Sequence, residues 1–199
     1  GFTRLRGSVG VDDSGDRSHR AGPREPFARA DVEAAATELA AILLAERADV
    51  LTIYDRAGGY GHPDHVRIHA VGTRAAALAG TPVLLEATVD RARLQRGLRL
   101  IGWLPGLPAG FRAGAFADRY CAPRELTHRI DVREYLAAKR AAMTAHASQS
   151  GADDGARTLA FCLRLPHRLY ARVFGYEWFR EPDRAPSGPL LDDIFATLR

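Results

Sequence analysis

The residues best suited to chemistry lie together in one short stretch, within or just after the glycine-rich segment 57–61. In chain order they are Tyr60, His62, Asp64, His65 and His69. Imidazole nitrogens bind zinc at about 2.0–2.1 Å, and a nearby carboxylate can hold an imidazole in one tautomer. If a helix begins near Pro63, the three histidines project to one side of it. The spacing therefore indicates a metal or acid–base site, although histidines at a helix start also often satisfy polar groups of a loop.

The flanking residues predict the elements that position this stretch. The run Asp49–Tyr54 is short, apolar and β-branched, as expected of a strand buried in a parallel sheet. A helix over Asp64–Ala79 follows, with Pro63 at its start, where the fixed φ of proline is tolerated. Sites in open α/β sheets form outside the carboxyl ends of strands, and the glycine-rich segment lies at such an end. We assign His69 to structure, because it lies one turn too deep in the helix to share an ion.

The rest of the chain continues the alternation of helix and strand, which predicts an α/β fold with an open, mostly parallel sheet flanked by helices. A short extended piece over residues 1–11 leads into a polar turn, and residues 102–124 form a long loop that could cover the domain. The other predicted elements are helices over Ala30–Arg47, Val89–Leu98, Val132–Ala147 and Leu159–Val173, the last broken at Pro166, a strand over Thr81–Ala87 and an edge strand over Tyr176–Phe179.

Side chains outside the motif receive structural expectations. His19 and His128 lie among polar residues and are expected to be solvated. Trp103 and Trp178 are expected to pack in the core or under a lid, since large aromatic rings contribute most by burial. The buried side of the helix over 132–147 is expected to comprise Tyr135, Leu136, Ala142 and Met143.

Composition excludes several classes of protein. A chain of 199 residues with 46% hydrophobic and 26% charged residues is expected to form one domain with a real core. No apolar run approaches the roughly 20 residues of a membrane span. The most basic stretch, Arg91–Arg99, contains no aromatic residue, which argues against nucleic-acid binding. The two cysteines, Cys121 and Cys162, match no metal or redox motif, so we expect reduced thiols and a cytoplasmic location.

The glycine and histidine motif also carries a resemblance. The residues Gly58–His65, following a strand that ends Tyr54-Asp55, resemble the second signature of the LmbE/PIG-L family of zinc-dependent N-deacetylases. These enzymes remove acyl groups from amino sugars and related small amides, and they include deacetylases and amidases of the mycothiol pathway. Further stretches that resemble the family are Asp13–Gly15, Lys139–Gln149, Glu177–Phe179 and Asp192–Phe195. The resemblance implies a Rossmann-like α/β fold with a C-terminal excursion, and Zn²⁺ as cofactor.

The resemblance implies a role for each residue of the motif. His65 is the zinc ligand, and His62 acts as general acid or stabilises the tetrahedral intermediate. Asp64 orients His62, and Tyr60 donates a hydrogen bond to the developing oxyanion. Asp13 contacts a hydroxyl of the N-acylated amino sugar or small amide, although an aspartate in an Asp-Ser-Gly turn is more often only a turn former.

One part of the family pattern is missing. The first signature, a His-Pro-Asp-Asp stretch that supplies two zinc ligands and the general base, does not occur in residues 1–199. We expect this stretch, with its strand and helix, to precede Gly1, so that residues 1–199 form a single domain lacking its first strand and helix. Replacement ligands could otherwise come only from the cluster Asp12, Asp13, Asp16 and His19. The alternative function is that of a non-catalytic small-molecule-binding or interaction module that has lost the first motif.

Overall fold

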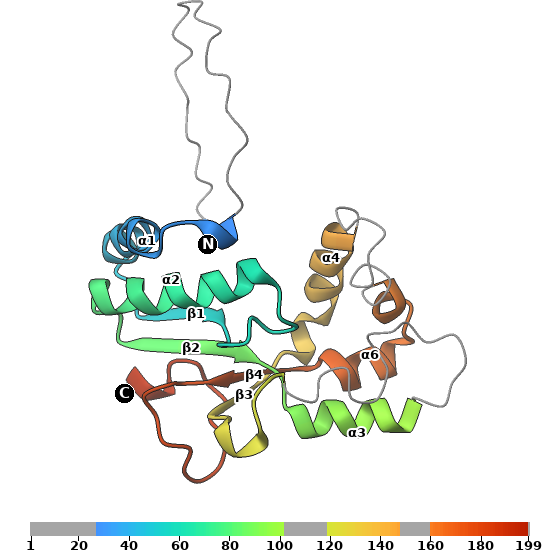
Figure 1. Ribbon diagram of the computed structural model, residues 1–199. Coiled ribbons are helices and arrows are strands. Elements are labelled where there is room, and N and C mark those ends of the chain that lie inside the picture. The colour runs from blue at the N-terminus through green and yellow to red at the C-terminus, as the bar shows by residue number, and fades with distance from the viewer. Residues whose placement is uncertain (1–26, 102–118, 148–159, 199) are drawn as a thin grey trace, which may run out of the picture.

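The computed structural model describes residues 27–101, 119–147 and 160–198, and their strands form one mixed four-stranded sheet (Figure 1). The sheet has the order β1-β2-β4-β3. Strand β2 is parallel to β1, whereas β4 is antiparallel to both of its neighbours, β2 and β3. The strands are β1 (Val50–Tyr54), β2 (Val83–Thr88), β3 (His128–Asp131) and β4 (Tyr176–Arg180).

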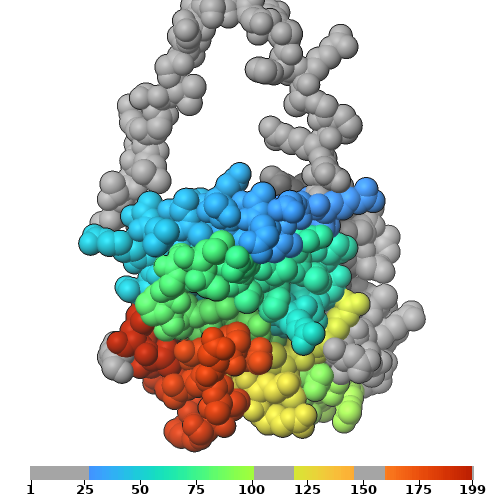
Figure 2. Space-filling view, turned by 60° about the vertical axis from the view of Figure 1, so that its left-hand side comes forward, coloured from blue at the N-terminus to red at the C-terminus, as the bar shows by residue number. Residues whose placement is uncertain are grey.

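Helices cover one face of the sheet and extend beyond its end. Helix α2 lies between the sheet and α1, while α3, α4 and α6 lie beyond the end of β2 (Figure 1). Figure 2 shows the same order in space, with α1 as the outer layer and the C-terminal segment on the opposite side. The helices are α1 (Val32–Glu46), α2 (Pro63–Ala79), α3 (Arg91–Ile101), α4 (Leu136–Ala147) and α6 (His167–Phe174). Short 3-10 turns are η1 (Phe27–Arg29), η3 (Pro123–Glu125), η4 (Arg133–Tyr135) and η5 (Ala196–Leu198).

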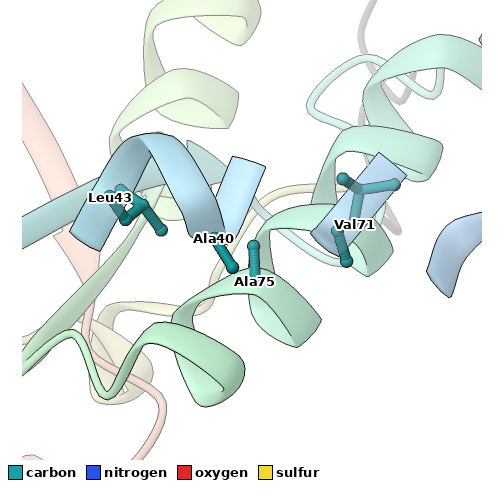
Figure 3. Close-up of a cluster of buried hydrophobic side chains, with 5 residues drawn as sticks. Ala40, Leu43, Val71 and Ala75 are labelled. Atoms are coloured by element: carbon teal, nitrogen blue, oxygen red, sulfur yellow. The ribbon is translucent and has the colours of Figure 1, made fainter. Parts of the chain in front are cut away.

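Small apolar side chains let the two covering helices pack closely. Ala40 and Leu43 of α1 meet Val71 and Ala75 of α2 in a buried cluster (Figure 3). Alanines at such contacts allow neighbouring helix axes to approach at the short end of the usual 8–10 Å range. Asp31 caps the N-terminus of helix α1, and its side chain accepts a hydrogen bond from the backbone N–H of Ala34 at 2.7 Å. This packing fixes α2, and with it the start of α2 at the candidate site.

A second buried cluster joins the strands of the sheet. Val83 and Leu85 of β2 pack with Phe179 of β4, and Ile130 and Ile194 lie against them. Leu85 is fully buried. The C-terminal segment therefore contributes to the core that supports β2.

Most of the predicted elements are confirmed, but the sheet differs from expectation. The α/β class is confirmed, and β1, β2, α1 and α2 fall close to their predicted ranges. Of the described strand pairs only β1 and β2 run parallel, so a mostly parallel sheet is not confirmed. The prediction of an edge strand over Tyr176–Phe179 was wrong, because β4 lies between β2 and β3.

Individual side chains also differ from expectation. His128 was expected to be solvated, but it is fully buried in β3, which the sequence did not predict. On the helix after β3, Leu136 is buried as predicted, whereas Tyr135 and Ala142 are exposed. Trp178 packs in the sheet at 9% exposure, as predicted. Residues 1–26, with the expected extended piece, and residues 102–118, with Trp103, lie outside the described residues.

No described helix combines the length and the apolar character needed to cross a bilayer.

Candidate metal and substrate site

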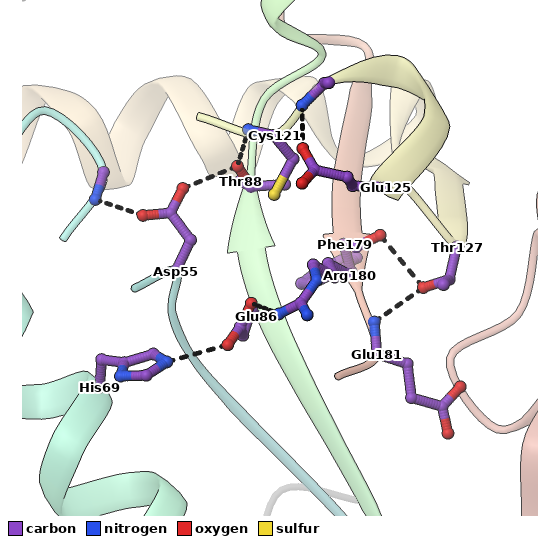
Figure 4. A network of polar contacts seen from close by, with 12 residues as sticks. Asp55, His69, Glu86, Thr88, Cys121, Glu125, Thr127, Phe179, Arg180 and Glu181 are labelled. Carbon is purple, nitrogen blue, oxygen red and sulfur yellow. Dashed lines mark hydrogen bonds and ion pairs between the residues drawn. The ribbon is translucent and has the colours of Figure 1, made fainter. Parts of the chain in front are cut away.

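The candidate site begins where β1 ends, at a turn held by a buried carboxylate. Asp55 is only 3% exposed, and its Oδ1 accepts a hydrogen bond from the backbone N–H of Gly59 at 2.9 Å. Its Oδ2 accepts a hydrogen bond from the hydroxyl of Thr88, at the end of β2, at 2.7 Å (Figure 4). The turn closes with Gly58 N–H donating to the Asp55 carbonyl at 2.8 Å. Asp55 thus fixes the glycine turn to both parallel strands.

The glycine turn folds directly onto the first turn of α2, and this contact requires glycine at position 58. Gly58 has φ of +67°, where a side chain is disfavoured. A Cβ at this position would lie 2.8 Å from the backbone nitrogen of Val66 and 3.1 Å from the carbonyl oxygen of His62. The turn therefore brings the Gly58 carbonyl close to the side chains at the start of α2.

His62 caps the N-terminus of α2. Its Nδ1 accepts a hydrogen bond from the backbone N–H of Asp64 at 3.2 Å, so the neutral ring carries its proton on Nε2. The Asp64 carboxylate lies 3.8 Å from the same Nδ1. The other carboxylate oxygen of Asp64 accepts a hydrogen bond from the backbone N–H of Ala28 at 2.9 Å. Nearly half of the His62 side chain is exposed, so its Nε2–H can serve as a donor to a bound molecule.

His65 is held in one tautomer. Its Nδ1 lies 3.3 Å from the carbonyl oxygen of Gly58, and because a carbonyl can only accept, Nδ1 carries the proton. Its ring stacks on Tyr54 with centroids 3.8 Å apart and planes within 5°. Burial lowers the pKa of His65, and the neighbouring His62 lowers it further, against the opposing effects of the Gly58 carbonyl and Asp64. The neutral ring therefore keeps a lone pair on Nε2, which is the form that binds a metal.

Tyr60 completes a group of rings at this end of α2. Its ring meets His65 edge-on at 5.1 Å between centroids and His62 at 6.1 Å. The two imidazoles are 5.0 Å apart. The structure thus brings together Tyr60, His62 and His65, with Asp64 beside them.

His69 lies apart from this group. Its Nε2 is 2.9 Å from Oε1 of Glu86, a buried carboxylate whose Oε2 accepts a hydrogen bond from Arg180 at 2.8 Å (Figure 4). Burial alone would raise the pKa of Glu86, but the hydrogen bonds from His69 and Arg180 outweigh it and lower the pKa. His69 therefore joins α2 to the sheet, in keeping with the structural role assigned to it.

The remaining residues considered for the site fall outside what is described. Asp13, with Asp12, Asp16 and His19, lies in the segment 1–26. Across residues 27–101, 119–147 and 160–198, no group of three or more histidine, cysteine or acidic side chains is arranged to hold a metal ion. His65 is thus one candidate ligand, with a tautomer that fits zinc.

Sequence reasoning missed two supporting residues, Asp55 and Tyr54. Both had been treated only as the end of a strand. An acidic residue directly after a buried strand, at the carboxyl end of a parallel pair, was the available signal for Asp55. The stacking of Tyr54 on His65 had no sequence signal, because residues 11 apart in different elements meet only once the turn is folded.

The α/β fold places a cluster of histidines at the end of β1, and comparison with known proteins shows which family has this sequence. The chain belongs to the LmbE-like family of N-deacetylases. It is 35% identical to a 1D-myo-inositol 2-acetamido-2-deoxy-alpha-D-glucopyranoside deacetylase of Nocardioides sp., over 94% of this chain and 69% of the relative. Deacetylases with the same description from Nocardia farcinica and Catenulispora acidiphila are 37% and 40% identical, over 80% and 86% of this chain.

The similarity covers only part of each relative. The matches to the Nocardia farcinica and Catenulispora acidiphila proteins span 58% and 63% of their lengths. No family model matches the chain. The membership therefore rests on the individual relatives, while the activity and substrate of the whole protein are matters for proposal.

Proposed function

We propose that the protein is a zinc-dependent N-deacetylase that acts on an N-acetylated amino sugar, with N-acetylglucosaminyl-inositol as the substrate to test first. The substrate is taken from the descriptions of the relatives. The observation that supports the proposal most directly is the neutral His65, whose Nδ1 is occupied by the Gly58 carbonyl and whose Nε2 retains its lone pair.

His65 is the residue that would hold zinc through Nε2. Because zinc sites of hydrolases have three protein ligands, the other two come from outside the described residues. The cluster Asp12, Asp13, Asp16 and His19 is one candidate source. Bound zinc supplies a water whose pKa is lowered toward about 7, and hence hydroxide at neutral pH.

The other residues of the site act on the amide. His62, with its proton on Nε2, would donate a hydrogen bond to the amide. To act as general acid it would first take up a second proton from solvent at Nδ1, then pass its Nε2 proton to the departing amine nitrogen and become neutral again. Asp64, whose carboxylate lies 3.8 Å from Nδ1 of His62, would hold the orientation of that ring. Tyr60, whose ring lies beside His65, would donate a hydrogen bond from its phenolic hydroxyl to the oxyanion that develops on the carbonyl oxygen. Asp13 is proposed to bind a sugar hydroxyl.

Zinc content and deacetylation test the proposal together. Zinc per chain is measured by elemental mass spectrometry after dialysis against a weak chelator, and release of the free amine from N-acetylglucosaminyl-inositol is measured in parallel. His65→Ala is expected to lose both zinc and turnover, whereas His167→Ala, at an exposed histidine at the start of α6, is expected to retain both.

Turnover in His65→Ala equal to that of the unchanged protein would refute the proposal. A protein that binds the amino sugar, but does not bind zinc and does not hydrolyse the amide, would instead fit the non-catalytic binding module. Circular dichroism of both variants shows whether a loss reflects the site or the fold.

A further inference from the structure

One arginine outside the motif lies against the turn that carries Tyr60 and His62. Gly61 has φ of +92°, and a Cβ built on it would overlap the guanidinium of Arg119, 2.8 Å from its Cζ. Gly61 therefore provides the room in which this guanidinium packs. Because Gly61 stands between Tyr60 and His62 in the chain, Arg119 lies at the edge of the candidate site.

The segment that carries Arg119 is fixed by the same buried carboxylate that holds the turn. The backbone N–H of Cys121 donates to the hydroxyl oxygen of Thr88 at 3.2 Å, and that hydroxyl donates to Asp55 at 2.7 Å (Figure 4). Asp55 in turn accepts from Gly59 in the glycine turn. The position of Arg119 relative to the turn is thus set by a continuous chain of hydrogen bonds.

The residue next to Arg119 shows that this arrangement is imposed by the fold. Tyr120 has φ of +63°, a conformation that residues with side chains adopt only where their surroundings hold them. Its ring lies against the turn, with Cε1 3.9 Å from the place of a Cβ on Gly59. Burial raises the pKa of Tyr120 to about 12, so its phenol stays neutral beside Asp55. Arg119 and Tyr120 consequently both pack against the glycine turn.

Arg119 is an exposed residue, and it takes part in none of the ion pairs formed among the described residues. Other arginines form ion pairs there, such as Arg74 with Glu33 and Arg180 with Glu86. No acidic side chain of the ranges 27–101, 119–147 and 160–198 lies within ion-pair distance of Arg119. Its donors therefore remain available to a bound molecule.

We propose that Arg119 binds a pair of oxygen acceptors on the part of the substrate that lies beyond the acetamide group. The planar guanidinium presents parallel N–H donors that match two neighbouring oxygens, such as vicinal hydroxyls of a ring or two oxygens of a phosphate. The inference rests on the proposed function, because it places the acetamide at His62 and His65. It makes Arg119 a residue that determines which amino-sugar conjugate is bound.

Equilibrium binding of the amine products tests the inference without depending on turnover. Isothermal titration calorimetry compares three ligands. Glucosamine carries no second group, glucosaminyl-inositol adds a ring of hydroxyls, and glucosamine 1-phosphate adds a phosphate. The variants are Arg119→Met, which removes the donors, and Arg119→Lys, which keeps the positive charge but lacks the planar pair of N–H donors. Arg124→Met, at an exposed arginine five residues further along, is the matched control.

Arg119→Met is expected to weaken binding of one conjugate about tenfold to a hundredfold and to leave glucosamine within about twofold, as expected for loss of a charge-assisted hydrogen bond. Loss confined to glucosaminyl-inositol assigns the hydroxyl pair, and loss confined to the 1-phosphate assigns an anionic group. If the parallel N–H donors of the guanidinium are what binds the conjugate, Arg119→Lys recovers less than half of the affinity lost, measured as the logarithm of Kd. Arg124→Met leaves every affinity unchanged.

Three results would overturn the inference: an equal loss for glucosamine and both conjugates, no loss for any ligand, or no binding of either conjugate by the unchanged protein. The proposed function fails separately. If binding of a conjugate depends on Arg119 but the protein does not deacetylate its substrate, only the deacetylase proposal is overturned. If the protein deacetylates its substrate but the Arg119 variants bind both conjugates as tightly as the unchanged protein, only this inference is overturned.

Discussion

Replacing Gly58 by alanine tests how closely the turn is fitted to helix α2. Gly58 combines a left-handed backbone, with φ of +67°, and a close approach to the backbone nitrogen of Val66. Helix α2 ends with a second left-handed glycine, Gly80, whose φ is +64° and whose Cβ position has no atom within 4 Å. Gly80→Ala is therefore a matched control that has the backbone strain without the contact.

The expected magnitudes follow from these two positions. A left-handed conformation costs a residue with a side chain roughly 1–2 kcal/mol, and replacing glycine recovers about 0.4–1 kcal/mol by restricting the unfolded chain. Gly80→Ala should thus destabilise the fold by about 1 kcal/mol or less. Gly58→Ala bears the same strain and also forces an atom to within 2.8 Å of Val66, and such overpacking costs about 1–3 kcal/mol more. We expect a total of about 1–4 kcal/mol.

Urea denaturation followed by circular dichroism measures both variants against the unchanged protein. The midpoint should fall further for Gly58→Ala than for Gly80→Ala, with the slope of the transition unchanged. Each kcal/mol corresponds to about 2–4 °C in thermal midpoint for a chain of this size. Equal losses of stability in the two variants would show that the contact with Val66 is absent or easily relieved, and the close fit of the turn to α2 would then be refuted.

Two further predictions concern the core beneath the site. The pKa of Glu86 lies below the ordinary value, so its ion pairs stabilise the fold above about pH 4.3 and are lost as the pH falls through the lowered pKa. Glu86→Gln should therefore lose about 2 kcal/mol at pH 7, with the difference from the unchanged protein shrinking toward pH 3; a difference that does not depend on pH would contradict the assignment. Leu85→Ala, at a fully buried residue, should lower the free energy of unfolding by about 2–5 kcal/mol. Leu44→Ala, at a residue that is 58% exposed, should lower it by no more than about 0.5 kcal/mol. The urea midpoints of the two variants measure the difference, and similar losses for both would contradict the burial of Leu85 in the core.

The elements next to the motif were predictable because their signals are local. The apolar period of α1 and the β-branched run of β1 can each be recognised within one element. Pro63 marks the start of α2, and the glycines before it mark the turn. Such features depend on residues a few positions apart, so they can be recognised without knowledge of the rest of the fold.

The sheet order was not predictable in the same way, because it depends on pairing between distant segments. Strand β4 pairs with β2 through Glu86 and Arg180, which are 94 residues apart. Nothing in the run Tyr176–Arg180 distinguishes an edge strand from a central one. His128 was misjudged for the same reason, since its polar neighbours conceal the fact that it is a buried residue in a strand that pairs with β4.

The candidate site divides along the same line. The grouping of Tyr60, His62 and His65 follows from one turn and one helix start, and the sequence predicted both of these elements. The side chains that hold this group in place come from elsewhere: Tyr54 lies under His65, and Asp55 is tied to Thr88. The partner of Asp55 is set by the parallel pairing of β1 with β2, and that of Tyr54 by the folding of the glycine turn, and no local pattern reveals either contact.

This division explains why the supporting residues matter for specificity. In the proposed function, the motif supplies a metal ligand and a proton donor to an amide, and these roles are the same for every substrate that contains an amide. Discrimination between substrates requires contacts away from the reacting bond. In this fold such a contact is available at Arg119, which β2 holds against the glycine turn through Thr88 and Cys121.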